Sequence, residues 1–237
     1  MPTGLVEINK DKEVKFKGYV TAPANGVYPG VLLLHQEFGI DANIRSMAEL
    51  CAAKGYTVFV PDLFWRDLPG CELNSNKETD LEQASKLVKT YNIDKGYQDV
   101  VSCLQWLRET PQCNGLVTTI GYGIGANLSY LSGLWLDIES SVCYDFDGFS
   151  FFQEHDTFIR RPMLIHLAKK IYNDLRENDK LKFLDNINNI KLNIYDKCEK
   201  NFTRISDKNF NESETLNSQT KTFTHILEAF NNPHTHS

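Results

Sequence analysis

The sequence predicts a doubly wound α/β fold, in which a mostly parallel sheet is covered by helices on both faces. Short apolar runs of the kind that buried parallel strands need alternate with segments of roughly 10 to 15 residues that carry helical periodicity. Gly and Pro mark several of the boundaries, as Pro29 and Gly30 do before the apolar run that begins at Val31. In folds of this type, functional groups lie on loops at the carboxyl ends of the strands.

The strands are predicted from two patterns. Residues Glu13 to Val20 alternate with period two, which indicates an early strand, expected at an edge of the sheet. Runs rich in apolar residues predict buried strands at residues 31–35, 56–60, 116–120, 141–144 and 163–167, and a further strand is predicted at residues 191–195.

The helices are predicted between these strands. Asp41 is expected to cap a helix that ends at Gly55, Thr79 has capping-box spacing to Glu82, and Asp94 is expected to start a further helix. Three more helices are predicted at residues 124–136, 172–186 and 218–230. The polar stretch 209–221 fits a mobile loop as well as it fits an ordered segment.

Length and composition favour one α/β domain over residues 1–237, with a disordered tail at 231–237. The net charge of −6, with Lys and Arg dispersed, argues against nucleic-acid and anionic-membrane partners. Because no signal segment or membrane span is visible, a cytoplasmic protein is the expectation. The six cysteines lack C-x-x-C spacing and are expected to be free, packed thiols rather than disulfides or metal ligands.

Four motifs follow one another in a characteristic order. They are His35–Ile40 (HQEFGI), Gly55-Tyr56 with Pro61–Phe64 (PDLF), Gly121–Gly125 (GYGIG) and Arg161–His166 (RPMLIH). In this order and spacing they resemble the dienelactone hydrolase family, from about Phe16 to Phe230. The resemblance implies an α/β-hydrolase-like three-layer sandwich fold. Enzymes of the family open cyclic enol lactones with a Cys-His-Asp triad, and the resemblance implies no cofactor or metal.

The positions that the resemblance assigns to catalysis all hold other residues. The thiol nucleophile falls on Gly123, where the G-x-S-x-G elbow presents Ser or Cys above the sheet. The triad aspartate falls on Ile171 and the triad histidine on Lys200. The carboxylate that readies the thiol falls on Gln36, and Glu37, one place further on, is expected to point elsewhere.

Shifted residues offer little replacement for the triad. Asp174 is expected on the surface of a helix, and His225 inside the last helix as a surface or partly packed side chain. His35 and His166, at strand ends, are expected to be hydrogen-bonded structural groups. Lys200 could act as a base only if water were the attacking group.

The former site is expected to have become more positive. The Ile124 amide begins a helix, where unpaired N–H groups and the helix dipole favour an anion. Arg204 falls on a substrate-carboxylate arginine of the family, although the second such position falls on Leu81. Lys169 and Lys170 lie on an adjacent loop and either add to this field or are ordinary surface lysines.

The sequence therefore favours a non-catalytic pseudo-hydrolase. It would bind a small anionic ligand, or a protein partner, through Gln36, Ile124, Lys200 and Arg204. Two alternatives stay open, which are an active hydrolase of the family that uses unidentified residues and a purely structural subunit with a filled pocket. An open cleft in which Lys200 and Arg204 converge on the Ile124 amide would favour ligand binding.

Overall fold

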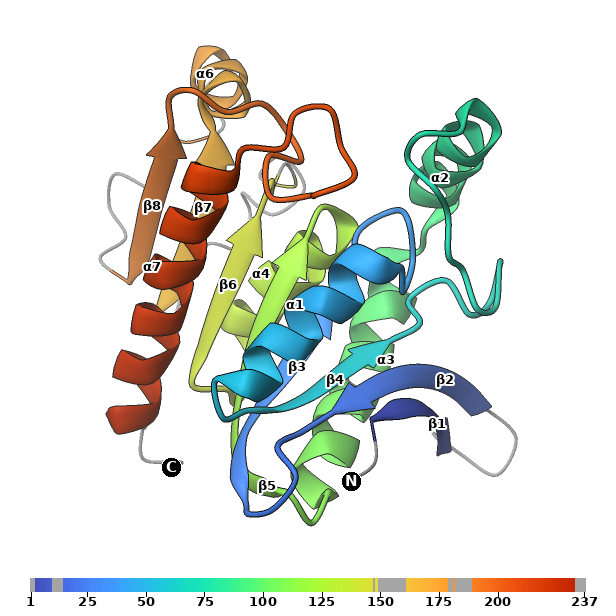
Figure 1. Cartoon of the computed structure of the whole chain (residues 1–237), viewed down its shortest axis with the longest axis vertical. Helices are drawn as coiled ribbons and strands as arrows, with labels where there is room; N and C mark the ends of the chain where they lie inside the picture. Colours follow the sequence, from blue (N-terminus) through green and yellow to red (C-terminus); the bar gives the residue numbers. More distant parts are fainter. Residues whose placement is uncertain are drawn as a thin grey trace.

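The computed structural model describes residues 3–9, 15–146, 148, 161–178, 181 and 189–232, and it has the α/β-hydrolase fold (Figure 1). Its sheet has the order β1-β2-β4-β3-β5-β6-β7-β8. The β1–β2 and β2–β4 pairs are antiparallel, and the remaining pairs are parallel. The strands are β1 (Gly4–Asn9), β2 (Lys15–Thr21), β3 (Tyr28–Leu34), β4 (Thr57–Pro61), β5 (Cys113–Tyr122), β6 (Ser140–Tyr144), β7 (Met163–Ala168) and β8 (Ile190–Tyr195).

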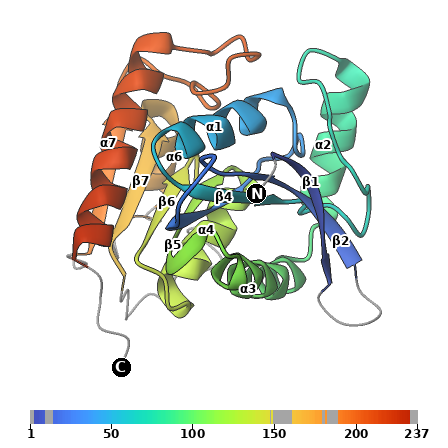
Figure 2. The same ribbon diagram turned by 60° about the horizontal axis from the view of Figure 1, so that its bottom comes forward.

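Helices cover both faces of the sheet, as predicted. Helices α1 (Ala42–Ala53) and α7 (Glu212–Asn231) pack on one face, and α3 (Ile93–Glu109) and α4 (Ile124–Trp135) pack on the other. Figure 2 shows α1 and α3 on opposite sides of the sheet. Helices α2 (Glu78–Thr90) and α6 (Lys169–Glu177) lie toward the end of the molecule to which β5 to β8 point (Figure 1). The loops at that end form the candidate site.

The prediction that the early strand lies at the sheet edge is wrong, because β1 pairs outside β2. Strand β1 was missed because its short segment turns few apolar side chains inward. Ile8 is buried and Val6 packs against the core, whereas Leu5 is 70% exposed. A single edge strand with one covered face gives only this weak period-two signal.

Three helix starts differ from the prediction. Helix α2 begins one residue before Thr79 with no side-chain cap, so the capping box is not formed. Asn92, not Asp94, caps α3 by accepting from the Lys95 amide. The polar stretch 209–221 is not a loop throughout, because Asn211 caps α7 and the helix runs through it from Glu212.

The polar start of α7 is held by hydrogen bonds rather than by an apolar stripe. The buried Thr215 hydroxyl donates to the carbonyls of Asn211 and Phe202, and the Ser218 hydroxyl donates to the Thr215 carbonyl. Of the predicted helix 172–186, α6 accounts for the part up to Glu177, and most of the remainder lies outside the described residues. Of the predicted tail, residues 233–237 lie outside them, whereas Asn231 ends α7.

Candidate functional site

The turn from β5 into α4 has the geometry of a nucleophile elbow. Gly123 stands at its apex with φ 52° and ψ −118°, and its amide donates to the Tyr144 carbonyl of β6 at 3.1 Å. A Cβ on Gly121 would lie 2.1 Å from the Gly125 oxygen, and a Cβ on Gly125 would lie 2.3 Å from the Leu34 oxygen. Strand and helix therefore approach so closely that only glycine fits at either position.

A carboxylate occupies the space in which a nucleophile at residue 123 would begin. A Cβ built on Gly123 would lie 3.0 Å from Oε2 of Glu37 and 3.3 Å from Cβ of Gln36. The expectation that Glu37 points elsewhere is therefore wrong. Glu37 is the site residue that the sequence analysis missed.

The turn after β3 explains this direction. His35 Nδ1 and the Gly39 amide both donate to the Gln36 carbonyl, at 2.7 and 3.2 Å, which tightens residues 36–39. Gly39 has φ +78°, and a Cβ on it would lie 1.9 Å from the Cys71 carbonyl oxygen. This close packing fixes the turn and directs residue 37 onto the elbow.

An open cavity of about 320 Å³ lies over Gly123, and we call it the elbow cavity. Its charged side chains are Glu37, Lys89 and Lys200, so that cations outnumber anions by one. Oδ1 of Asn127 in its wall is buried without a hydrogen-bond partner in the described structure. The lining residues are Glu37, Phe38, Leu81, Ala84, Ser85, Val88, Lys89, Gly123, Ile124, Asn127 and Lys200.

The side chains at the other two predicted triad positions do not form a proton relay. Ile171 lies on α6 and packs against the cluster of Ala168, Tyr195, Cys198 and Phe202. The exposed Lys200 lies at the rim of the elbow cavity. Asp174 is exposed on α6, as expected, and does not take the place of the triad acid.

Arg204 does not converge with Lys200 on the Ile124 amide, which corrects the prediction. Its side chain is 4% exposed, its Nη2 lies 2.5 Å from Oδ2 of Asp41, and its guanidinium lies 4.2 Å from the ring centroid of Phe38. Asp41 also caps α1 through its other oxygen, which accepts from the Ile44 amide at 3.1 Å. Arg204 is therefore already neutralised by a buried partner.

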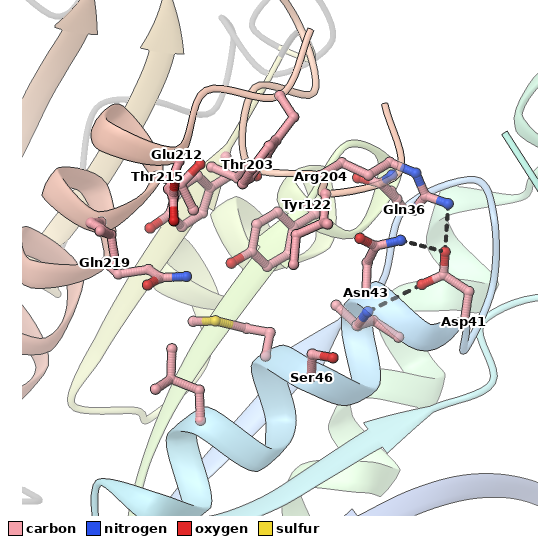
Figure 3. A pocket seen from close by; sticks show the side chains of 17 residues that line it. Gln36, Asp41, Asn43, Ser46, Tyr122, Thr203, Arg204, Glu212, Thr215 and Gln219 are labelled. Atoms are coloured by element: carbon pink, nitrogen blue, oxygen red, sulfur yellow. Dashed lines mark hydrogen bonds and ion pairs between the residues drawn. The ribbon is translucent and has the colours of Figure 1, made fainter. Parts of the chain in front are cut away.

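The four predicted ligand-binding residues are divided between two cavities. Ile124 and Lys200 line the elbow cavity, whereas Gln36 and Arg204 line a second cavity of about 300 Å³ between α1 and α7 (Figure 3). Lys169 and Lys170 pair with Asp196 and Glu199, at 3.3 and 3.7 Å, so the positive field at the site is weaker than the sequence predicts.

Comparison with known proteins identifies the family. The model of the dienelactone hydrolase family matches residues 16–232. The chain belongs to the dienelactone hydrolase family. It is 26% identical over 219 residues to carboxymethylenebutenolidase 1 of Cupriavidus pinatubonensis, covering 92% of this chain and 93% of that protein.

Solved structures share the fold at lower identity. A Klebsiella pneumoniae protein assigned as a dienelactone hydrolase superposes with a TM-score of 0.77 at 14% identity, covering 96% of this chain and 99% of that one. The dienelactone hydrolase of Anabaena variabilis gives a TM-score of 0.69 at 17% identity, covering 96% and 97% of the two chains. The predicted family and fold are thus confirmed.

In this member of the dienelactone hydrolase family, two of the remaining histidines are structural, as expected. His35 Nε2 accepts from the Leu63 amide at 3.0 Å, which ties β3 to the loop after β4, and burial lowers the pKa of His35 to about 4. His166 contacts the Tyr195 hydroxyl at 2.7 Å and the Thr222 hydroxyl at 3.0 Å, and burial lowers its pKa to about 3. His225 is 4% exposed, so it is more deeply buried than predicted.

The described residues offer no other obvious nucleophile. The six cysteines are free and buried, as predicted, and burial raises the pKa of the Cys51 and Cys143 thiols to about 12. Within the described ranges, His, Cys, Asp and Glu form no group of three or more that could hold a metal ion. No helix in that part of the chain combines the length and apolarity needed to cross a membrane.

Proposed function

We propose that this protein is a non-hydrolytic member of the dienelactone hydrolase family that binds a small carboxylate ligand in the elbow cavity. The observation that carries the proposal is the elbow itself. Gly123 supplies no reactive atom, and a Cβ on it would lie only 3.0 Å from Oε2 of Glu37.

The residues around Gly123 favour binding over acyl transfer. Ser85 supplies a hydroxyl from α2, but no histidine among the described residues lines the cavity to activate it. Triad members act as a unit, so the absence of the nucleophile, base and orienting acid together removes most of the rate. The cavity is nonetheless open, which supports ligand binding over a filled, purely structural site or a surface that only a protein partner covers.

The charges define the class of ligand. Lys200 and Lys89 at the rim attract a carboxylate, and the first amides of α4, beginning with Ile124, favour an anion. Glu37 opposes a purely anionic group, because its carboxylate can only accept hydrogen bonds when ionised. The best fit is therefore a small carboxylate that also carries a hydroxyl or ammonium donor for Glu37.

The binding proposal is tested with three molecules of similar size, which are lactate, propionate and lactamide. Lactate offers both groups, propionate lacks the hydroxyl, and lactamide lacks the charge. We expect lactate to bind most tightly in calorimetry. Lys200→Gln should weaken lactate binding roughly three- to ten-fold, because it removes one solvent-exposed charge-assisted contact.

Two further variants test which side chains determine the affinity for lactate. Glu37→Gln should remove the preference for lactate over propionate. Lys208→Gln changes an exposed lysine that lines neither cavity and should leave the affinity unchanged. Equal affinities for the three probes, or no effect of Lys200→Gln, would refute the proposal.

A second candidate function rests on the same carboxylate. Glu37 over the elbow could act as a general base that delivers water to a carbonyl bound near the Ile124 amide. We expect no turnover of p-nitrophenyl acetate or of an enol lactone above background. Turnover that Glu37→Gln abolishes would establish this second function and reject the non-hydrolytic one.

A further inference from the structure

The cavity between α1 and α7, here called the α1–α7 cavity, lies apart from the elbow cavity. Its floor includes Tyr122 at the end of β5, with Thr203, Arg204 and Glu212 above it (Figure 3). Tyr144, at the end of β6, also lines the cavity. The ring of Phe38, which lines the elbow cavity, stacks on Arg204, which lines the α1–α7 cavity. These two side chains form part of the wall between the cavities.

Most of the exposed surface inside the α1–α7 cavity is apolar, although polar residues also line it. Met47 and Leu50 come from α1, Phe210 comes from the loop, and Leu216 on α7 is 59% exposed at the rim. Exposed apolar groups at the mouth of an apolar cavity are typical of sites for uncharged molecules.

The floor of the α1–α7 cavity is rigid. The Tyr144 hydroxyl lies 2.7 Å from the Thr222 hydroxyl, which also contacts His166. The rings of Tyr122 and Tyr144 stack with centroids 4.6 Å apart. A preformed wall lowers the entropic cost of binding a small molecule.

Two hydrogen-bond donors in this lining lack a partner. Nε2 of Gln36 is buried and makes no hydrogen bond in the described structure. The Tyr122 hydroxyl also has no partner among the described residues, and it points across the cavity toward Gln219 of α7 (Figure 3). Burial raises the pKa of Tyr122 well above its usual range, so the phenol stays protonated and is a donor. A buried donor without a partner, such as Nε2 of Gln36, is uncommon in folded proteins and calls for an acceptor, and the Tyr122 hydroxyl is placed to donate to the same acceptor.

The charged groups of the α1–α7 cavity do not favour an anion. Arg204 is paired with Asp41, and Nδ2 of Asn43 also contacts that carboxylate at 3.4 Å. Glu212, the other charged residue of the lining, is an exposed carboxylate. An anionic ligand would meet no uncompensated cation in this lining.

We infer that the α1–α7 cavity binds a neutral, mostly apolar molecule that carries an acceptor oxygen, such as a ketone or an ester. The apolar walls take the body of the molecule, and the Tyr122 hydroxyl donates to the oxygen, with the Gln36 amide as a second donor. This site is chemically distinct from the carboxylate site proposed over Gly123.

The test uses three probes of nearly the same shape, which are acetophenone, ethylbenzene and benzoate. Binding is measured by ligand-observed NMR on the full chain. We expect acetophenone to bind more tightly than ethylbenzene, which lacks the acceptor, and more tightly than benzoate, which carries a charge. Tyr122→Phe should weaken acetophenone binding roughly two- to ten-fold and leave ethylbenzene unchanged, because one neutral hydrogen bond is lost.

Two other variants locate the site and control for folding. Ser46→Trp places a bulky group at an exposed position of α1 in the lining and should abolish binding of all three probes. Tyr97→Phe alters a tyrosine on α3 that lines neither cavity and should change nothing. Tyr122→Phe breaks no internal hydrogen bond, so its melting temperature should match that of the parent.

Each outcome of these binding experiments either supports or overturns the inference. Acetophenone binding that persists in Ser46→Trp, or that is not detected in the parent, overturns the inference. If benzoate binds most tightly, Arg204 is available to anions and the inference is overturned. If ethylbenzene binds as tightly as acetophenone, the Tyr122 hydroxyl plays no part in binding and the inference is also overturned. Lys200→Gln should leave acetophenone binding unchanged, so that this test does not depend on the carboxylate site.

Discussion

Replacing Gly123 by alanine should destabilise the fold by a predictable amount. Gly123 has φ 52°, and a side chain in the left-handed region costs on the order of 1 to 2 kcal/mol. The added Cβ would also lie 3.0 Å from Oε2 of Glu37. That oxygen is the far end of a flexible side chain that can move aside, so the contact adds little to the backbone strain.

The expected change is measurable by thermal and urea denaturation. For a chain of this length, 1 to 2 kcal/mol corresponds to a fall of roughly 2 to 8 °C in the melting temperature. Gly123→Cys should show a similar loss and restore no hydrolysis, because without histidine at 200 the thiol has no general acid to protonate a leaving group.

A matched pair of glycines separates strain from steric contact. Gly70 has φ +72° and nothing within 4 Å of an added Cβ, so Gly70→Ala reports positive φ alone. We expect its cost to be close to that of Gly123→Ala. Gly121→Ala, whose Cβ would lie 2.1 Å from the Gly125 oxygen, should disrupt the elbow outright. A melting temperature for Gly123→Ala at or above that of the parent would refute the assignment of residue 123 to a strained elbow.

Two further predictions concern buried charge. Burial lowers the pKa of His35 to about 4, that of His166 to about 3 and that of His225 to about 4. Below pH ~6.5 the unfolded chain therefore binds more protons than the folded chain. The free energy of unfolding should be highest above pH ~6.5 and should fall as the pH drops toward 4. The free energy of unfolding, measured by urea titration between pH 7.5 and 4.5, should therefore decline by up to ~1.4 kcal/mol per pH unit for each histidine. The decline should be less steep in His225→Gln, and a pH-independent free energy of unfolding contradicts the prediction. Arg204→Met should destabilise the chain by roughly 3 to 5 kcal/mol, because it leaves the Asp41 carboxylate buried without its cation, and adding Asp41→Asn should recover part of the loss in a double-mutant cycle. If instead Arg204→Met alters lactate affinity and not stability, the pairing with Asp41 is not the role of this arginine.

The parts of the fold that follow from local patterns were predictable. Five apolar-rich runs predicted strands within a few residues of their observed bounds, because buried parallel strands are nearly continuous in apolar side chains. The edge strand β8 was also predicted, although its segment contains Lys191 and Asn193. The elbow was predictable for a similar reason, since glycines at 121 and 125 are required by backbone contacts of 2.1 and 2.3 Å. Helix α7 extended further than predicted because hydroxyls of Thr215 and Ser218, rather than apolar periodicity, hold its first turns.

The direction and pairing of the site's charged side chains were not predictable. Glu37 turns onto the elbow because Gly39 packs against the Cys71 carbonyl, a contact between segments far apart in the chain. Arg204 pairs with Asp41 for the same kind of reason, and no pattern within either segment indicates it. Two of the four predicted ligand-binding residues therefore lie in a different cavity from the other two.

Three of the four positions predicted to have lost a catalytic side chain share one physical property, which supports the non-hydrolytic proposal. Active sites carry a stability cost, because catalysis needs strained backbone and polar groups that the surrounding fold would not otherwise favour. In this chain, the residues at positions 123, 171 and 200 instead suit the backbone conformation, packing or solvent exposure of their positions. Glycine relieves the positive φ at 123, Ile171 packs against an apolar cluster that includes Phe202, and Lys200 is exposed to solvent. Glu37 and Gln36 stand apart from these three. The Glu37 carboxylate borders the open elbow cavity beside the α4 N-terminus, which favours its charge, and the Gln36 amide nitrogen is buried without a hydrogen-bond partner in the described structure. A residue that local packing does not demand is where a retained function is most expected, so Glu37 is the first position at which to look for one.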